Sequence, residues 1–232
     1  MTSSTSMSPE QVMAHLEGLG SESVRKSNAR RGASTNQFGV RVGELRALAK
    51  TLGTDHPLGL ALWATGNEDA RFLATMLLDP AAMGDAELEA MVAPLTYEVL
   101  IDELVDNVVA NAPVADALRE RWMPSEDPTL GHAGWMLLID RVMKKQTADL
   151  DLAAILDTIE SGVVAAPESK QWAMNRCMVE IAVRHPALTE RCIAIGERHG
   201  RLDNRPVPKG CYSSYAPEWI AAVLRRKQAA KR

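Results

Sequence analysis

The sequence predicts an all-α fold in which antiparallel helix pairs stack in series as an α-solenoid. One stretch shows the repeating unit most clearly: one helix ends at Gly66-Asn67, and a second runs from Glu68 to a stop at Pro80. Similar hairpins recur along the chain, and no segment alternates as a strand would. Aromatic residues make up 4% of the chain against 46% hydrophobic residues. This composition favours helix-on-helix packing over a β-sandwich.

The helices of the first half follow from caps, punctuation and apolar spacing. Ser8 is placed as an N-cap, with Pro9 at the first helical position. Further on, Val42, Leu45 and Leu48 recur at the three-residue spacing of an amphipathic face. The helices predicted in this half span 9–19, 21–31, 41–51, 57–64, 68–78, 85–92, 94–111 and 114–122.

The second half continues with longer helices and one irregular segment. Lys144 and Lys145 lie where a helix C-terminus favours positive charge, and Pro186 forces a break between two helices. Pro206 and Pro208 flank one residue and exclude a helix there. The predicted helices span 129–145, 148–163, 169–185, 186–199 and 218–226. Their unequal lengths indicate a degenerate, HEAT-like array and not a consensus repeat.

The domain organisation predicted from these elements is simple. A chain of 232 residues with a continuous supply of apolar positions can form one large domain, and we expect it to span 8–226. Residues 1–7 are expected to be a disordered tail and residues 227–232 a basic tail. Within the domain, 200–217 is the segment expected to be non-helical.

Several classes of protein are excluded by the bulk properties. A net charge of -4 argues against a wholly basic nucleic-acid binder, and no apolar run approaches the roughly 20 residues of a membrane span. The chain start lacks a secretion signal, so a cytoplasmic protein is expected. Cys177, Cys192 and Cys211 match no zinc pattern and are interpreted as reduced and structural. With no nucleotide loop or metal cluster either, no cofactor, no metal and no membrane partner is predicted.

Charge is distributed unevenly along the chain. Residues 79–127 are acidic, whereas the segment 24–50 and the C-terminal segment are basic. The cations of the first basic segment, set against Glu44 alone, are Arg25, Lys26, Arg30, Arg31, Arg41, Arg46 and Lys50. Two interpretations stay open: a basic rim that holds a polyanion by its phosphates, or an ordinary solvated helix face.

Four segments together resemble the HEAT-repeat alkylpurine DNA glycosylases, the AlkD-like DNA alkylation repair proteins. Each motif is weak alone, but their order and spacing are those of the family over most of residues 20–185. The segments are 38–46 (FGVRVGELR), Leu62-Trp63 with 68–71 (EDAR), 99–104 (VLIDEL) and 133–138 (AGWMLL).

The resemblance implies a C-shaped superhelix of helix pairs whose basic concave face grips duplex DNA through the phosphates. Family members excise N3- or N7-alkylated purines by hydrolysing the N-glycosidic bond, and they use a carboxylate, an arginine and tryptophans. Alkylation makes the purine a cationic leaving group, and its departure builds positive charge on the sugar. A nearby carboxylate stabilises that charge and positions water, while aromatic faces hold the cation.

Carried onto this chain, the family pattern yields three candidate catalytic residues. Asp102 falls at the position of the catalytic carboxylate, and Tyr97 lies near that of an upstream aromatic. His132, with Gly131 before it, occupies the place of the family arginine. The residues expected to bind DNA are Lys26, Arg30, Arg31, Arg41, Lys144, Lys145, Trp172, Arg176 and Lys209.

Simpler interpretations accompany each candidate, and they leave the enzyme class open. Glu98, Asp102 and Asp106 are four residues apart, so they share one helix face that could simply be solvated or could take up a cation. His132 fits a polar residue near a helix start, and Trp135 fits the core. The alternative function is therefore a non-catalytic HEAT-repeat scaffold on the same fold that binds DNA or a protein.

Overall fold

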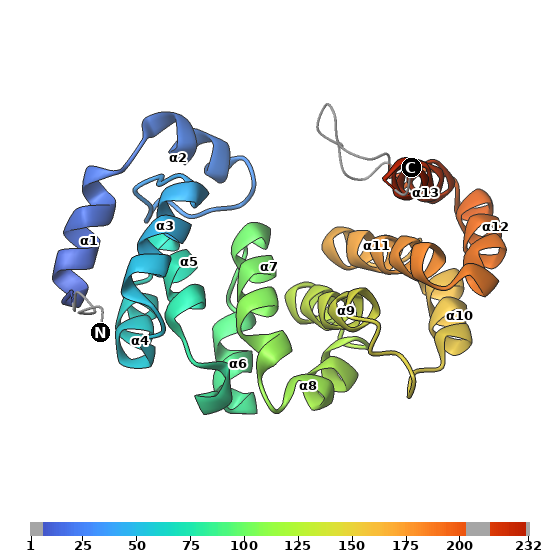
Figure 1. The fold of residues 1–232 in the computed structure, drawn as a ribbon, viewed down its shortest axis with the longest axis horizontal. Helices are drawn as coiled ribbons and strands as arrows, with labels where there is room; N and C mark the ends of the chain where they lie inside the picture. Colours follow the sequence, from blue (N-terminus) through green and yellow to red (C-terminus); the bar gives the residue numbers. More distant parts are fainter. Residues whose placement is uncertain (1–6, 203–213, 231–232) are drawn as a thin grey trace. The chain divides into compact units, whose positions relative to one another are not determined.

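The computed structural model describes residues 7–202 and 214–230, and within those ranges all regular structure is helical (Figure 1). The all-α prediction is confirmed. No helix in the described part of the chain is long and apolar enough to cross a membrane. The structure divides into two compact units, Met1–Leu118 and Arg119–Arg232. The expectation of one domain over 8–226 stays a prediction.

The first unit is built from short helices. Two 3-10 turns, η1 (Pro80–Ala82) and η2 (Val109–Asn111), lie between its later helices. The boundary between the two units, after Leu118, falls within α8. The α-helices are α1 (Pro9–Gly18), α2 (Glu22–Ala29), α3 (Val42–Leu52), α4 (His56–Ala64), α5 (Glu68–Leu77), α6 (Asp85–Val92), α7 (Glu98–Asn107) and α8 (Ala115–Trp122).

Helix α5 forms the centre of the first unit. It packs against α3, α4 and α7, and Figure 1 shows α4 beside it as the other arm of the predicted hairpin. Its start is fixed by the Asn67 side chain, which accepts hydrogen bonds from the backbone N–H groups of Asp69 and Ala70. Phe72 and Leu73 are buried in the core, and burying such a side chain stabilises the fold by about 1.5–3 kcal/mol.

The second unit is centred on two long helices, α9 and α11, that run in the same direction: His132 near the start of α9 contacts Ser169, and Met136 further along contacts Arg176. Gly134 lets α9 approach the backbone of Trp122 and Met123 closely, because a Cβ at position 134 would lie 2.4 Å from the Met123 nitrogen. Cys177 and Cys192 are buried free thiols, and Cys211 lies outside the described residues. The elements are α9 (Pro128–Met143), α10 (Leu152–Gly162), α11 (Glu168–Arg184), η3 (Pro186–Leu188), α12 (Thr189–His199) and α13 (Ala216–Ala229).

One predicted helix is wrong at both ends. The span 94–111 was expected to be continuous, but α7 covers only Glu98–Asn107. Before it, Thr96 donates a hydrogen bond to the Gly32 carbonyl (3.3 Å), and Leu95 and Tyr97 are buried. After it, the Asn111 side chain donates to two carbonyls of the last turn and closes the helix.

Boundaries of other helices also differ from the sequence prediction, most clearly in α10, α12 and α13, and 186–188 of the helix predicted over 186–199 forms the 3-10 turn η3. Helix α10 begins at Leu152 and not at 148, because Asp151 caps it by accepting from two backbone N–H groups at 3.0 Å. Helix α13 begins at Ala216, since Pro217 is tolerated in a first helical turn, and it continues to Ala229. Ala216 and Pro217 of the segment expected to be non-helical, and the start of the expected basic tail, are therefore helical.

Candidate nucleic-acid interface

The buried carboxylate of Asp69 holds the end of the segment between α2 and α3. Asp69, 4% exposed at the start of α5, accepts backbone hydrogen bonds from Phe38 (2.6 Å), Gly39 (2.9 Å) and Val40 (2.9 Å). Gly39 has a φ of 78°, and a Cβ there would lie 2.5 Å from the Ser21 carbonyl oxygen. Only glycine suits this turn. The irregular segment that leads into α3 is therefore held in one conformation.

A second set of buried polar groups holds the earlier part of the same segment. Glu68, 7% exposed, accepts a hydrogen bond from the Ser34 backbone N–H at 3.0 Å through Oε1. Asn28 donates to Gln37 (3.2 Å), whose amide donates to the Ser34 carbonyl (2.8 Å). The other oxygen of Glu68, Oε2, is enclosed and has no hydrogen-bond partner among the described residues.

The structure presents several predicted DNA-binding cations on this fixed segment. Arg30, Arg31 and Arg41 are exposed, and so is Lys50 on α3, which the sequence placed in the basic cluster but not among the DNA contacts. None of these four side chains forms an ion pair within 7–202 and 214–230. Lys26 differs, because it pairs with Glu22 at 3.4 Å. The exposed cations are free to meet an anion without first breaking a pair.

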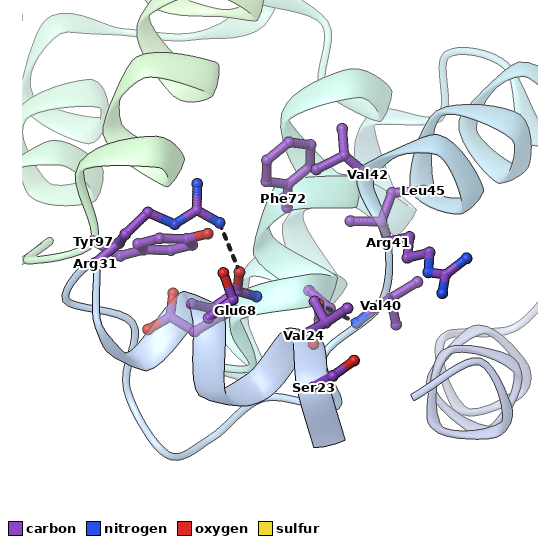
Figure 2. Close-up of a pocket in the computed structure, with 13 residues that line it drawn as sticks. Ser23, Val24, Arg31, Val40, Arg41, Val42, Leu45, Glu68, Phe72 and Tyr97 are labelled. Carbon is purple, nitrogen blue, oxygen red and sulfur yellow. Dashed lines mark hydrogen bonds between the residues drawn. The ribbon is translucent and has the colours of Figure 1, made fainter. Parts of the chain in front are cut away.

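A pocket lies between α2, the start of α3 and the start of α5, and Tyr97 from the end of the segment before α7 closes one side (Figure 2). Its volume is about 240 Å³. Burial raises the pKa of the Tyr97 hydroxyl; the Arg31 guanidinium lowers it, and the carboxylates of Asp69 and Glu68 raise it further. Tyr97, Arg31 and Arg41 are the predicted site residues that the structure brings together here.

The predicted catalytic carboxylate lies away from this pocket. Asp102 is half-buried in the middle of α7, and it does not line the cavity. Glu98 and Asp106 share its helix at four-residue spacing, and each of the three carboxylates already takes part in an interaction with another residue. Neighbouring Glu103 forms an ion pair with Arg46 (3.1 Å). In the described residues no group of His, Cys, Asp and Glu is arranged to hold a metal ion.

In the second unit, the predicted catalytic residue His132 is buried. His132 is 1% exposed, and its Nδ1 lies 3.0 Å from the Ser169 carbonyl oxygen, to which it can donate. Beside it, Gly131 leaves room for Lys170, whose ammonium donates to the Ser125 carbonyl (2.9 Å). His132 therefore joins α9 to α11 inside the unit, and in this conformation it offers no surface to a phosphate.

Two of the remaining candidates of the second unit, Trp172 and Arg176, are partly covered. Trp172 stacks on Trp219 with ring centroids 5.3 Å apart, which ties α11 to α13. Arg176 is half-buried, with Nη1 3.7 Å from the Met136 sulfur. The other three are lysines: Lys144 pairs with Asp140 at 2.9 Å, Lys145 is exposed, and Lys209 lies outside the described residues.

Comparison with known proteins identifies the family of this chain. The sequence model of the DNA alkylation repair enzyme family matches residues 12–220. The chain belongs to the DNA alkylation repair family. No curated protein sequence matches it significantly.

A solved structure also resembles this member of the DNA alkylation repair family. It belongs to a family of proteins described as related to the HEAT-like repeat DNA glycosylases, with affinity for branched DNA structures. The two chains are 25% identical and superpose with a TM-score of 0.85, and the match covers 95% of each. The predicted HEAT-like helical repeat fold is confirmed.

The family motifs in this chain prove to be largely structural. In the EDAR segment, Asp69 holds the FGVR segment by its backbone, and Arg71 lies over the Trp63 ring at 5.3 Å and donates to the Trp63 carbonyl. The sequence predicted both segments as family motifs, but it did not predict that Glu68 and Asp69 bind the loop 30 to 34 residues earlier. The available signal was two acids directly after an N-cap asparagine, Asn67, together with Gly39 in the earlier segment.

Proposed function

We propose that this chain binds DNA through its phosphate backbone and that Arg30, Arg31 and Arg41 make the principal contacts. The observation that carries this proposal is their exposure without ion pairs on a segment whose backbone Glu68 and Asp69 hold by hydrogen bonds. A cation without an ion pair has no salt bridge to break when it meets a phosphate, and it releases the counterions of the DNA. Because the backbone is held, little ordering is required on binding.

Duplex DNA and its branched forms are the proposed substrates. The structural relative that matches 95% of this chain is described as having affinity for branched DNA, and the family is one of DNA alkylation repair. A branch point places phosphates of more than one duplex near one surface. Arginines on a loop and on a helix start can meet phosphates in several directions, which suits such a substrate.

Salt dependence of binding tests the phosphate contacts directly. Fluorescence anisotropy of a labelled duplex and of a labelled four-way junction should show affinity that falls steeply with salt. The triple variant Arg30→Gln, Arg31→Gln, Arg41→Gln should reduce the slope of log K against log salt by about 2–3 units, because each duplex phosphate contact contributes about 0.9.

The matched control removes a positive charge that is already paired. Arg198 on α12 pairs with Glu160 at 2.6 Å, so Arg198→Gln should leave the slope unchanged. Absence of binding to both DNAs at low salt would overturn the proposal. An unchanged slope in a folded triple variant would move the interface away from the α2–α3 segment.

Base excision is the second candidate function, and one observation favours it. Asp102 is half-buried on α7, where partial exclusion of water strengthens its attraction for positive charge building on a sugar. Burial of His132, which stands where the family has an arginine, speaks against it. Release of free alkylpurine from methylated DNA by the wild-type protein, abolished by Asp102→Asn, would establish excision. Binding without release would leave the DNA-binding proposal as the function.

A further inference from the structure

The pocket beside Tyr97 has one apolar side and one polar side (Figure 2). Val24, Val40, Leu45 and Phe72 supply the apolar wall. The polar side is formed by side chains that can donate, accept or carry charge: Ser27, Asn28, Arg31, Glu68 and Tyr97. Its volume of about 240 Å³ is below the roughly 300–1,000 Å³ of sites for drug-sized ligands, so it suits one small planar group.

An unsatisfied acceptor lines this pocket. Glu68 is 93% buried, and its Oε1 is used by the Ser34 backbone N–H, but Oε2 has no partner among the described residues. Native proteins rarely leave a buried carboxylate oxygen without a hydrogen-bond donor, so a missing donor is the simplest explanation. Arg31 is exposed and bonds only to Asn28 (3.0 Å) within the described residues, so it can move aside to admit one.

The rim of the same pocket favours a phosphate. Arg41 occupies the N-cap position of α3, a helix of 11 residues, and its side chain makes no capping hydrogen bond. The start of α3 therefore has no side-chain cap and carries an exposed arginine, and a helix N-terminus with such a residue attracts anions. A donor-bearing group inside and an anion at the rim together describe a nucleotide.

We propose that this pocket receives one unpaired nucleotide of a branched or bulged DNA. The base places a ring N–H or amino group on Glu68 Oε2, packs on the apolar wall with Phe72 and contacts Tyr97. Its phosphate lies at Arg41 and the start of α3. Every DNA base carries such a donor on its pairing edge, so the pocket selects the unpaired state and not a sequence. This inference depends on the proposed DNA binding and names the DNA feature that the surface recognises.

The test compares DNAs that differ only in one extrahelical base. Three fluorescein-labelled duplexes are titrated with the full chain at one salt concentration: fully paired, with a single adenine bulge, and with an abasic residue at the bulge. The abasic bulge keeps the bend and the extra phosphate but lacks the base. The adenine bulge should bind about tenfold tighter than the other two, a difference of about 1.4 kcal/mol.

Two variants test whether the preference for the adenine bulge comes from the pocket. Glu68→Gln keeps an oxygen for the Ser34 N–H but replaces the unsatisfied acceptor with a donor, and Ser27→Trp fills the cavity from an exposed position. Each should bind all three duplexes equally. Lys50→Gln, outside the pocket, should weaken all three by the same factor and keep the preference.

The outcomes separate this inference from the function on which it depends. Equal wild-type binding to all three duplexes, or a preference that survives in Ser27→Trp, overturns the nucleotide pocket and leaves DNA binding standing. Failure to bind any of the three overturns the DNA-binding proposal itself. A thermal melt by circular dichroism identifies a variant that has lost its fold. If Glu68→Gln is unfolded, the binding preference of Ser27→Trp decides the test.

Discussion

The segment between α2 and α3 and the helix pair α9–α11 present their polar residues in opposite ways. In the first, buried carboxylates lie beneath and bind the backbone, so that Arg30, Arg31 and Arg41 stand in solvent. In the second, two long helices pack lengthwise, and His132 is enclosed between them. The difference shows that a polar residue in a family motif can join two elements of the fold instead of meeting a ligand.

The largest effect on stability is expected from replacing Asp69, whose buried carboxylate holds the segment between α2 and α3. Asp69→Ala removes the acceptor of three backbone N–H groups and should destabilise the first unit by about 3–5 kcal/mol. Urea unfolding followed by far-UV circular dichroism measures it. Glu44→Ala, at an exposed position of α3, should change stability by less than about 0.5 kcal/mol. If the two variants are equally stable, Asp69 does not hold the segment.

The close packing that encloses His132 can be tested through a neighbouring glycine. A Cβ at Gly134 would lie 2.4 Å from the Met123 nitrogen and 2.6 Å from the Trp122 carbonyl carbon, so Gly134→Ala should cost about 2–3 kcal/mol. At Gly162 the nearest atom is the Met174 methyl carbon at 3.7 Å. Gly162→Ala should therefore stabilise the chain by about 0.5 kcal/mol. A tolerated alanine at Gly134 would show that α9 has room to shift.

The smallest expected effect sharpens the contrast, because it should appear in stability and not in binding. His132→Phe fills a similar volume but leaves the Ser169 carbonyl without its imidazole partner, a loss of about 1–2 kcal/mol. Affinity for duplex DNA should equal that of the wild type within measurement error, whereas Arg41→Gln should lower it. Reduced DNA affinity in a folded His132→Phe protein would assign His132 to the interface.

The fold could be predicted because its signals are local. Ser8 accepts from the Gln11 backbone N–H and Asn67 from those of Asp69 and Ala70, as their positions before apolar runs indicate. The span 94–111 failed because its irregular start is stabilised by Gly32, more than sixty residues earlier. Helix propensity contains no information about such a partner.

The candidate site was predicted less well for the same reason. The sequence marked Arg30, Arg31 and Arg41 as a basic cluster, and the structure leaves them exposed. It could not show that Glu68 would be buried with one oxygen unsatisfied, or that His132 would meet a carbonyl 37 residues further on. Burial and pairing depend on contacts between helices, and a single sequence does not state which helix faces are opposed.

The three hydrogen bonds to Asp69 also bear on how this surface can change. They engage backbone amides, so the geometry of the turn is independent of the side chains that project from it, apart from Gly39. Residues at 30, 31 and 41 can therefore be exchanged for other types while the scaffold keeps its shape. One carboxylate thus separates what this part of the molecule recognises from how it folds, and it makes the surface a natural starting point for re-engineering specificity.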